Sequence, residues 1–300
     1  MAGQIIGIIG GTGLGETFDR RESVERVVVD TPFGQPSAPI LRAEIGGATC
    51  LFLNRHGEGH RLNPSNVPYR ANVYALKTLG ATQIIASGAT GSLRAEVLPG
   101  HLVICDQVID KTFRRIGTFF DEGLVAHVEL ADPFCERLRK LLLDAARSIG
   151  REVHDGGTYV CMEGPQFSTR AESKLHRAWG GDLIGMTCMP EAKLAREAEM
   201  CYALIAMPTD YDCWRAHEPG TDRQTLLAEI ISNMRHATEA ATALIEEAIR
   251  RIGKVETAHC ACHDALQLAI WSDKQSVDGK VVEKLKPLVG KYFAGWTKED

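Results

Sequence analysis

The chain has 300 residues, of which 44% are hydrophobic and 24% are charged, an ordinary composition for a soluble globular protein. Its formal net charge of -5 excludes an extended nucleic-acid surface, because such a surface needs clustered lysine and arginine, but it is compatible with one buried anion site. The sequence shows no apolar run long enough to cross a bilayer and no basic, cleavable leader. We therefore expect a cytoplasmic protein with no membrane or nucleic-acid partner.

Short apolar runs alternate with segments of helical periodicity along most of the chain. Runs typical of buried strands lie at residues 4–10, 49–54, 82–88, 101–110, 157–163, 182–187 and 201–208. Helical periodicity appears at 68–79, 133–149, 170–179, 190–199 and 225–252. This alternation predicts an α/β fold with a single, mostly parallel or mixed sheet and helices on both faces. Ligand-binding groups are then expected where the strands end.

The character of the chain changes after the long helix expected at 225–252. A Cys/His cluster, a short apolar run and a Lys-rich amphipathic stretch follow Gly253. We therefore divide the chain into a main domain, 1–252, and a short helical C-terminal appendage, 253–300, that packs on it.

The appendage begins with the sequence HCACH, which places His259, Cys260, Cys262 and His263 close together. Three interpretations stay open: reduced packing thiols, a strained and reversible Cys-x-Cys disulfide, or a metal site. A zinc site would need ligands from elsewhere in the chain. We predict no metal in the functional site.

The first predicted strand runs directly into a glycine-rich segment, IIGGTGLGET. Gly11, Gly13 and Gly15 are followed by Glu16, which stands where a dinucleotide fingerprint needs its third glycine, and no Lys-Ser/Thr pair follows to make a nucleotide P-loop. The loop is therefore either a structural turn or an anion cradle. The hydroxyl of Thr12, a hydrogen-bond donor, favours the cradle.

Two further strand ends carry groups suited to an anion. Arg55 and His56 follow the run 49–54, where the guanidinium fork suits an oxyanion and the imidazole offers an N–H beside it. The small residues Gly88 and Ala89 follow the run 82–88 and allow close approach of their backbone amides. A lone Arg-His pair is often only a surface pair, but three such strand ends in one sheet predict a preformed pocket for a small dianion.

The run 201–208 ends in TDYDCW, which sets two carboxylates at the edge of the core. Strand alternation predicts that Asp210 and Asp212 point to the same side. A carboxyl group at the end of a buried strand beside another carboxylate is expected to have a raised pKa, which suits a general acid. The alternative is a solvated loop end or a helix cap.

Taken in order, these motifs resemble the methylthioadenosine phosphorylases, within the trimeric class of purine nucleoside phosphorylases. The resemblance covers roughly residues 4–250 and stops before the tail. The matching stretches are GIIGGTGL (7–14), NRHG (54–57), PSNVPYRANVYALK (64–77), GATGSLR (88–94), LVICDQVIDKT (102–112), EGPQFSTRAE (163–172), GMTCMPEAKLAREAEMCYA (185–203) and PTDYDCW (208–214).

The resemblance implies phosphorolysis, in which inorganic phosphate attacks C1 of the ribose and releases the purine. Phosphate is then a co-substrate, and no cofactor is expected. The phosphate-binding residues implied are Thr12, Arg55, His56, Gly88, Ala89 and Thr187. The substrate-binding residues implied are Met186 at the ribose, Phe167, Ser168, Tyr211, Asp210 and Asp212 at the purine, and His127. Asp210 is the implied catalytic acid, and His127 matches a position that reaches a neighbouring subunit's site, which implies a homotrimer or a dimer of trimers.

The two carboxylates also bear on the choice of base. An ionised carboxylate accepts a hydrogen bond from the amino group of adenine and repels the carbonyl of a 6-oxopurine. We expect methylthioadenosine as the first substrate and adenosine as a second, with Leu226 and Leu227 beside the 5-substituent. Two alternatives stay open: a phosphorylase that prefers methylthioinosine or inosine, and a nucleoside-binding sensor without catalysis.

Overall fold

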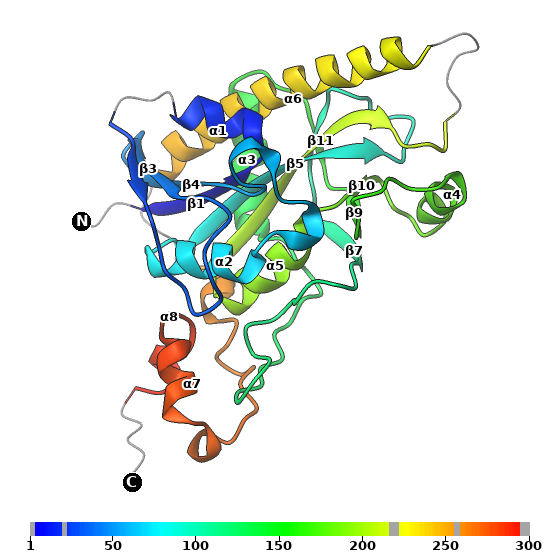
Figure 1. The fold of residues 1–300 in the computed structure, drawn as a ribbon. Coiled ribbons are helices and arrows are strands. Elements are labelled where there is room, and N and C mark those ends of the chain that lie inside the picture. The colour runs from blue at the N-terminus through cyan, green and yellow to red at the C-terminus, as the bar shows by residue number, and fades with distance from the viewer. Residues whose placement is uncertain (1–3, 20–22, 216–221, 255–258, 295–300) are drawn as a thin grey trace.

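The computed structural model describes residues 4–19, 23–215, 222–254 and 259–294 (Figure 1). One 11-stranded sheet forms its centre, and both parallel and antiparallel pairs occur in it. The predicted α/β fold class with a mixed sheet is confirmed. The strands are β1 Ile5–Gly10, β2 Glu25–Val27, β3 Ile40–Ile45, β4 Ala48–Asn54, β5 Gln83–Ser92, β6 Leu102–Ile104, β7 Gln107–Lys111, β8 Val153–Asp155, β9 Thr158–Met162, β10 Leu183–Gly185 and β11 Cys201–Tyr211.

Helices cover both faces of the sheet, as predicted (Figure 1). One buried cluster contains Leu76 of α2 and Leu194 of α5, and the opposite cluster contains Leu14 of α1, Leu142 of α3 and Leu244 of α6. The α-helices are α1 Thr12–Asp19, α2 Tyr69–Thr78, α3 Glu136–Ser148, α4 Arg170–Ala178, α5 Cys188–Glu197, α6 Arg223–Ile252, α7 Gly279–Lys284 and α8 Lys286–Val289. Short 3-10 helices are η1 Glu58–His60, η2 Pro64–Asn66, η3 Ala261–Asp264, η4 Lys274–Ser276 and η5 Gly290–Tyr292.

The middle of the sheet sets several strand ends side by side. β1 pairs in parallel with β4 and β5, and β5 pairs in parallel with β11. In this register Gly10 lies opposite Asn54, and Ala206 lies opposite Gly88. The glycine-rich loop, Arg55, Gly88 and the end of β11 therefore meet at one edge of the sheet.

One of the predicted runs does not form a single strand. The run 101–110 is divided between β6 and β7, which pair with different neighbours, whereas the run 157–163 forms the single strand β9. The apolar character of the run 101–110 carries no signal for the break between β6 and β7.

The long helix α6 begins at the N-cap Asp222, whose carboxylate accepts hydrogen bonds from the amides of Gln224 and Thr225. Its predicted apolar stripe is buried only from Ala237 onward, and Leu227 remains 58% exposed. Figure 1 shows the reason: the first turns of α6 extend beyond the sheet. No helix in the described ranges is long and apolar enough to span a membrane.

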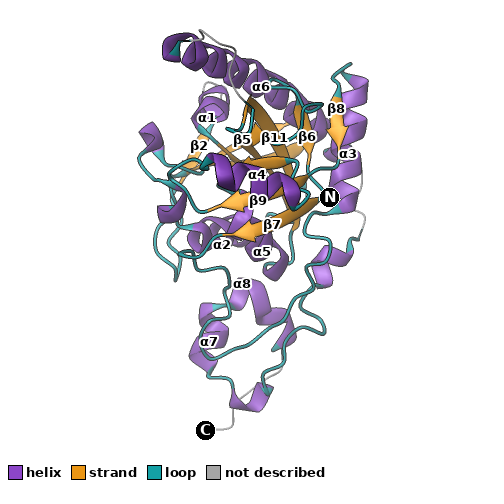
Figure 2. Ribbon diagram, turned by 90° about the vertical axis from the view of Figure 1, so that its right-hand side faces the viewer, coloured by secondary structure: helices purple, strands orange, loops and turns teal. Residues whose placement is uncertain are grey.

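The tail forms a small helical lobe beside the main sheet (Figure 2). Leu285, Leu288 and Val289 are buried in the same cluster as α2. The hydroxyl of Tyr74 donates to the carbonyl of Lys284 at 2.9 Å. The short C-terminal helices predicted for this region are present.

Candidate active site

Arg55 is held in place from several sides at the end of β4. Its Nε donates to Oε1 of Glu191 at 2.5 Å and its Nη2 to Oε2 at 3.0 Å, while Nη1 donates to the carbonyl of Ser87 at 2.8 Å and Nη2 also approaches the carbonyl of Ile9 at 3.5 Å. The side chains of Arg55 and Glu191 are each 1% exposed. These contacts occupy Nε, both hydrogens of Nη2 and one hydrogen of Nη1, which leaves the second Nη1 hydrogen without a partner among the described residues.

Gly88 lies directly beside this guanidinium. A Cβ atom at Gly88 would stand 3.1 Å from Oγ1 of Thr187 and 4.0 Å from Nη1 of Arg55. The absence of a side chain at this position thus leaves room between a guanidinium and a hydroxyl. Ala89, the next residue of β5, is exposed, so the opening lies at the surface of the strand end.

His56 is buried and has a defined hydrogen-bonding state. Its Nδ1 lies 2.9 Å from the carbonyl oxygen of Leu62, and a carbonyl oxygen only accepts, so Nδ1 carries a hydrogen. Burial and then the Arg55 guanidinium lower the pKa of His56 to about 4. The ring is therefore neutral at pH 7 and its Nε2 is an acceptor. Because the Nδ1 hydrogen is taken by Leu62, the sequence-based expectation that His56 offers an N–H to an anion is replaced: the ring nitrogen that remains, Nε2, is an acceptor.

The segment Met186–Thr187, at the start of α5, is fixed by Arg115. The Nη1 of Arg115 donates to the carbonyls of Met186 and Met189 at 2.6 Å each, and its Nη2 donates to the carbonyl of Glu163 at 2.7 Å. Thr187 is buried, and its amide donates to the hydroxyl of Tyr159 at 3.3 Å. Arg115 therefore joins the end of β9 to the residues that follow β10.

The two carboxylates at the end of β11 lie in different environments. Asp210 is half-buried, and its Oδ1 accepts a hydrogen bond from Oγ1 of Thr209 at 3.0 Å. Asp212 is 8% exposed, and its buried Oδ2 has no hydrogen-bond partner among the described residues. Such an acceptor is costly to bury unless a ligand donates to it.

The strand that carries these two side chains is irregular at its end. The pairing of β11 with β5 shifts register between Pro208 and Asp210, and the strand ends at Tyr211, one residue before Asp212. The Asp212 amide then donates to the carbonyl of Ser92 at 3.1 Å. The hydroxyl of Tyr211 donates to the carbonyl of Ala95 at 3.1 Å, so this hydroxyl is engaged within the protein.

The segment after β9 lies beside these carboxylates. Cys213 donates through Sγ to the carbonyl of Ser168 at 3.2 Å, and Oγ of Ser168 lies 3.7 Å from Sδ of Met162. Phe167 is 85% exposed, so within one chain this ring is left open.

The remaining predicted site residues are Thr12, His127 and Leu226. Thr12 is the first residue of α1, at the loop that follows β1, and its side chain lies outside what the structure describes. His127 is not brought to the strand ends: its ring packs against Trp271 at 4.6 Å, and its amide donates to the carbonyl of Ala269. Leu226 is half-buried near the start of α6, a helix that contacts the end of β11 where Nδ2 of Asn233 donates to the carbonyl of Thr209 at 3.0 Å.

Glu191 and Arg115 position other site residues and were not identified from the sequence. Both fall inside stretches that carried the family resemblance or lie next to one, but Arg55, the main partner of Glu191, is 136 residues away in the chain. Oε2 of Glu191 also accepts from the hydroxyl of Tyr202 at 3.0 Å. A buried arginine requires a buried counter-ion. The signal available in the sequence was therefore the need for an acidic residue to pair with Arg55.

Comparison with known proteins identifies the family of the chain. Residues 5–250 match the family model described as the phosphorylase superfamily. The S-methyl-5'-thioadenosine phosphorylase of Geobacter sulfurreducens is 49% identical over 96% of this chain and 99% of its own length. The protein of the same name from Cereibacter sphaeroides is 47% identical over 97% of this chain and 99% of its own length.

Solved structures give the same result. A methylthioadenosine phosphorylase from an antarctic soil metagenomic library is 42% identical and superposes with a TM-score of 0.88, covering 96% of this chain and 99% of that one. A mutant of the adenosine/methylthioadenosine phosphorylase of Schistosoma mansoni, in complex with methylthioadenosine, is 38% identical with a TM-score of 0.77, covering 84% of this chain and 93% of that one. The chain therefore belongs to the phosphorylase superfamily and, within it, to the S-methyl-5'-thioadenosine phosphorylases.

Proposed function

We propose that the chain cleaves 5'-methylthioadenosine with inorganic phosphate, giving adenine and 5-methylthioribose 1-phosphate for purine and methionine salvage. It is a pentosyltransferase. The observation that supports this most is the convergence of Arg55, Gly88 and Thr187 at strand ends next to the one that carries Asp210 and Asp212. One end of the site suits an oxyanion, and the other presents acceptors to a base.

In this proposal the anion is bound by directed donors rather than by net charge. Arg55 is paired with Glu191, and His56 is neutral, so the side chains around the anion contribute little net positive charge. The donors are the Nη1 hydrogen of Arg55 that has no partner in the described part of the chain, the hydroxyl of Thr187, and the backbone amides of Gly88 and Ala89. A monoprotonated phosphate has one hydrogen to give, and the acceptor Nε2 of His56 is suited to take it.

The reaction exchanges one bond for another at C1 of the ribose. A phosphate oxygen forms the new C1–O bond as the C1–N9 bond breaks, and the bonding electrons move into the purine. The bound phosphate also offsets the positive charge that develops on the sugar. Asp210 gives a proton to N7, so that adenine leaves neutral. Met186 lies against the ribose in this arrangement.

Asp212 determines the choice of base. Its buried Oδ2 lacks a donor among the described residues, and the exocyclic amine of adenine would supply one. A 6-oxopurine would instead place a carbonyl oxygen against the carboxylate. This favours methylthioadenosine over methylthioinosine, with Phe167 and Ser168 on the other side of the base.

We infer that the active unit is a homotrimer. His127 packs against the tail and away from its own strand ends, and Phe113, Leu268 and Trp271 are 79%, 89% and 72% exposed. Exposed apolar residues of this kind mark association surfaces. In a trimer His127 would complete the site of the neighbouring subunit and Phe167 would be covered.

No cofactor is required in this scheme, since phosphate is a co-substrate. We place the protein in the cytoplasm, because none of its nine cysteines is joined in a disulfide, which is typical of a reducing compartment.

The proposal is tested by incubating the full chain with methylthioadenosine, adenosine or methylthioinosine, with and without phosphate. We expect release of adenine from methylthioadenosine only when phosphate is present. Phosphate-dependent cleavage of methylthioinosine in preference would support the 6-oxopurine alternative, and binding of methylthioadenosine without cleavage would support the sensor.

A further inference from the structure

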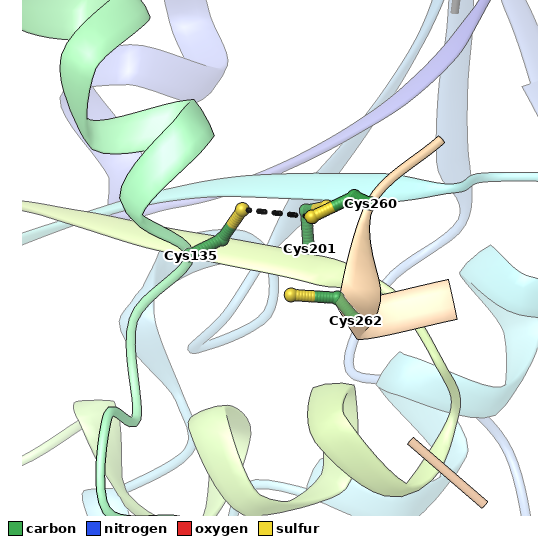
Figure 3. A group of neighbouring side chains, drawn as sticks. All are labelled: Cys135, Cys201, Cys260 and Cys262. Carbon is green, nitrogen blue, oxygen red and sulfur yellow. Dashed lines mark hydrogen bonds between the residues drawn. The ribbon is translucent and has the colours of Figure 1, made fainter. Parts of the chain in front are cut away.

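Four cysteine side chains from three distant parts of the chain meet at one point (Figure 3). Cys135 is the N-cap of α3, Cys201 begins β11, and Cys260 and Cys262 belong to the tail. All four Sγ atoms lie within 4.8 Å of one another. The Sγ atoms of Cys135 and Cys260 are 3.6 Å apart. None of the four residues belongs to the candidate active site.

These distances match a tetrahedral metal site better than any other use of the thiols. Zinc bound by four thiolates has Zn–S bonds of about 2.3 Å, which places the sulfur atoms about 3.8 Å from one another. A disulfide, in contrast, would join only two sulfurs at about 2.05 Å. Packing of inert thiols explains two sulfurs in contact, but it gives no reason for four to converge.

We propose that Cys135, Cys201, Cys260 and Cys262 form a structural zinc site that fastens the C-terminal tail to the main sheet. The tail supplies two ligands separated by one residue, and the sheet and α3 supply the two that the tail sequence lacks. On binding, each thiol releases its proton, so that four thiolates and Zn²⁺ form a centre with a net charge of 2-.

The surroundings of the cluster suit this negative charge. Nη2 of Arg137 lies 3.3 Å from Sγ of Cys201, and Nε of the same guanidinium is buried without a hydrogen-bond partner among the described residues. Nε2 of His263 lies 3.6 Å from the same sulfur. A guanidinium donor beside the sulfurs stabilises and orients metal thiolates. His259 is not part of this set, since its Nε2 pairs with Asp264 at 2.7 Å.

The cluster is also accessible to an ion. A cavity of about 950 Å³ adjoins it, and Cys135, Arg137, Cys260 and Cys262 lie on the cavity wall. An entry path of this kind is needed for zinc to load after the chain has folded.

Zinc at this point would reinforce contacts that already hold the tail. Glu199, two residues before Cys201, accepts hydrogen bonds from the amide of Leu266 at 3.1 Å and from the hydroxyl of Tyr292, and pairs with Lys291 at 2.7 Å. The metal would therefore join the start of β11 and α3 to the first residues of the tail, beside the contacts that Glu199 makes with later tail residues. Its role is structural, because all four coordination positions are filled by protein.

The test is the metal content of the full chain, expressed with zinc and purified without chelator. We expect one zinc per chain by elemental mass spectrometry. X-ray absorption at the zinc edge should show four sulfur neighbours at about 2.3 Å. Cobalt substitution should give the intense visible bands of a tetrahedral thiolate site. Cys262→Ser should bind zinc at least tenfold more weakly, while Cys213→Ser, a half-buried thiol outside the cluster, should keep the full content.

Several results would overturn the proposal. They are wild-type protein that holds no stoichiometric zinc, an absorption spectrum dominated by oxygen or nitrogen neighbours, and peptide mapping that finds any two of the four cysteines joined as a disulfide in protein kept under reducing conditions. The absorption measurement needs only the wild-type chain, so it decides the question even if a serine variant fails to fold.

Discussion

Arg55 and Glu191 are joined by two hydrogen bonds inside the protein, each with 1% of its side chain exposed. This pairing fixes the plane of the guanidinium, whose Nη1 would lie 4.0 Å from a Cβ atom at Gly88. It also cancels the guanidinium charge locally, so that the proposed phosphate site depends on the direction of its donors.

Removing the counter-ion should therefore impair both stability and phosphate use. Glu191→Gln leaves a buried guanidinium without its carboxylate, a change that costs roughly 3–5 kcal/mol. We expect a matching loss in the free energy of unfolding by urea and a KM for phosphate that rises more than the KM for methylthioadenosine. The control is Glu58→Gln, at an exposed pair with Arg26, which should cost less than about 1 kcal/mol. Equal effects of the two substitutions would contradict the assigned role.

Gly88→Ala tests whether the gap beside Thr187 is where the anion sits. The new Cβ would lie 3.1 Å from Oγ1 of Thr187 and fill that gap. We expect the KM for phosphate to rise by about tenfold or more, equivalent to roughly 1.4 kcal/mol, with little change in the free energy of unfolding. Gly117→Ala is the matched control, because its Cβ would meet only ordinary contacts at 3.6 and 3.7 Å. An unchanged phosphate KM in Gly88→Ala would place the anion elsewhere.

Asp212→Asn tests the choice of base. The amide would bring a donor to a position where the amine of adenine is expected to donate. We expect kcat/KM for methylthioadenosine to fall on the order of 10²-fold while that for methylthioinosine falls less or rises. Measuring both substrates with both proteins gives the ratio directly, and an unaltered ratio would show that Asp212 does not contact the base.

Asp210→Asn tests the proposed acid. An amide does not deliver a proton to N7, so kcat should fall on the order of 10² to 10⁴-fold. A substrate with a better leaving group, such as a nitrophenyl riboside, needs no such proton and should lose much less. A similar loss with both substrates would argue against proton transfer by Asp210.

His56 predicts a specific dependence of stability on pH. Its pKa is lowered to about 4 in the folded protein, against about 6.5 when unfolded, so the unfolded chain binds more protons between these values. Its stabilising contribution is complete above pH 6.5 and is lost as the pH falls toward 4. Compared with His56→Asn, wild-type protein should lose on the order of 3 kcal/mol across this window. A difference between the two proteins that is constant with pH would contradict the assigned pKa.

Much of the framework could be read from the sequence, because it depends on local periodicity. The runs 4–10, 49–54 and 201–208 became β1, β4 and β11, and the segment 225–252 became α6. β3 was missed because Arg42 and Glu44 interrupt its apolar pattern, and α1 was missed because it contains Gly13 and Gly15, which disfavour a helix.

Long-range contacts could not be read in the same way. The motifs predicted that Arg55, Gly88 and Thr187 would come together, and the structure places them so. No local sequence pattern indicated that Glu191 would pair with Arg55, or that Nδ1 of His56 would donate to the carbonyl of Leu62. Nothing in the sequence linked Cys135 or Cys201 to the tail, since only the fold brings them there.

The most direct test of the account is a crystal structure of the chain with methylthioadenosine and sulfate, the latter standing in for phosphate. We predict a sulfate oxygen within hydrogen-bond distance of Nη1 of Arg55 and Oγ1 of Thr187. The purine amine should lie beside Oδ2 of Asp212, so that one nucleoside spans the distance between the two ends of the site. A sulfate bound away from Gly88, or a purine turned away from Asp210 and Asp212, would contradict it.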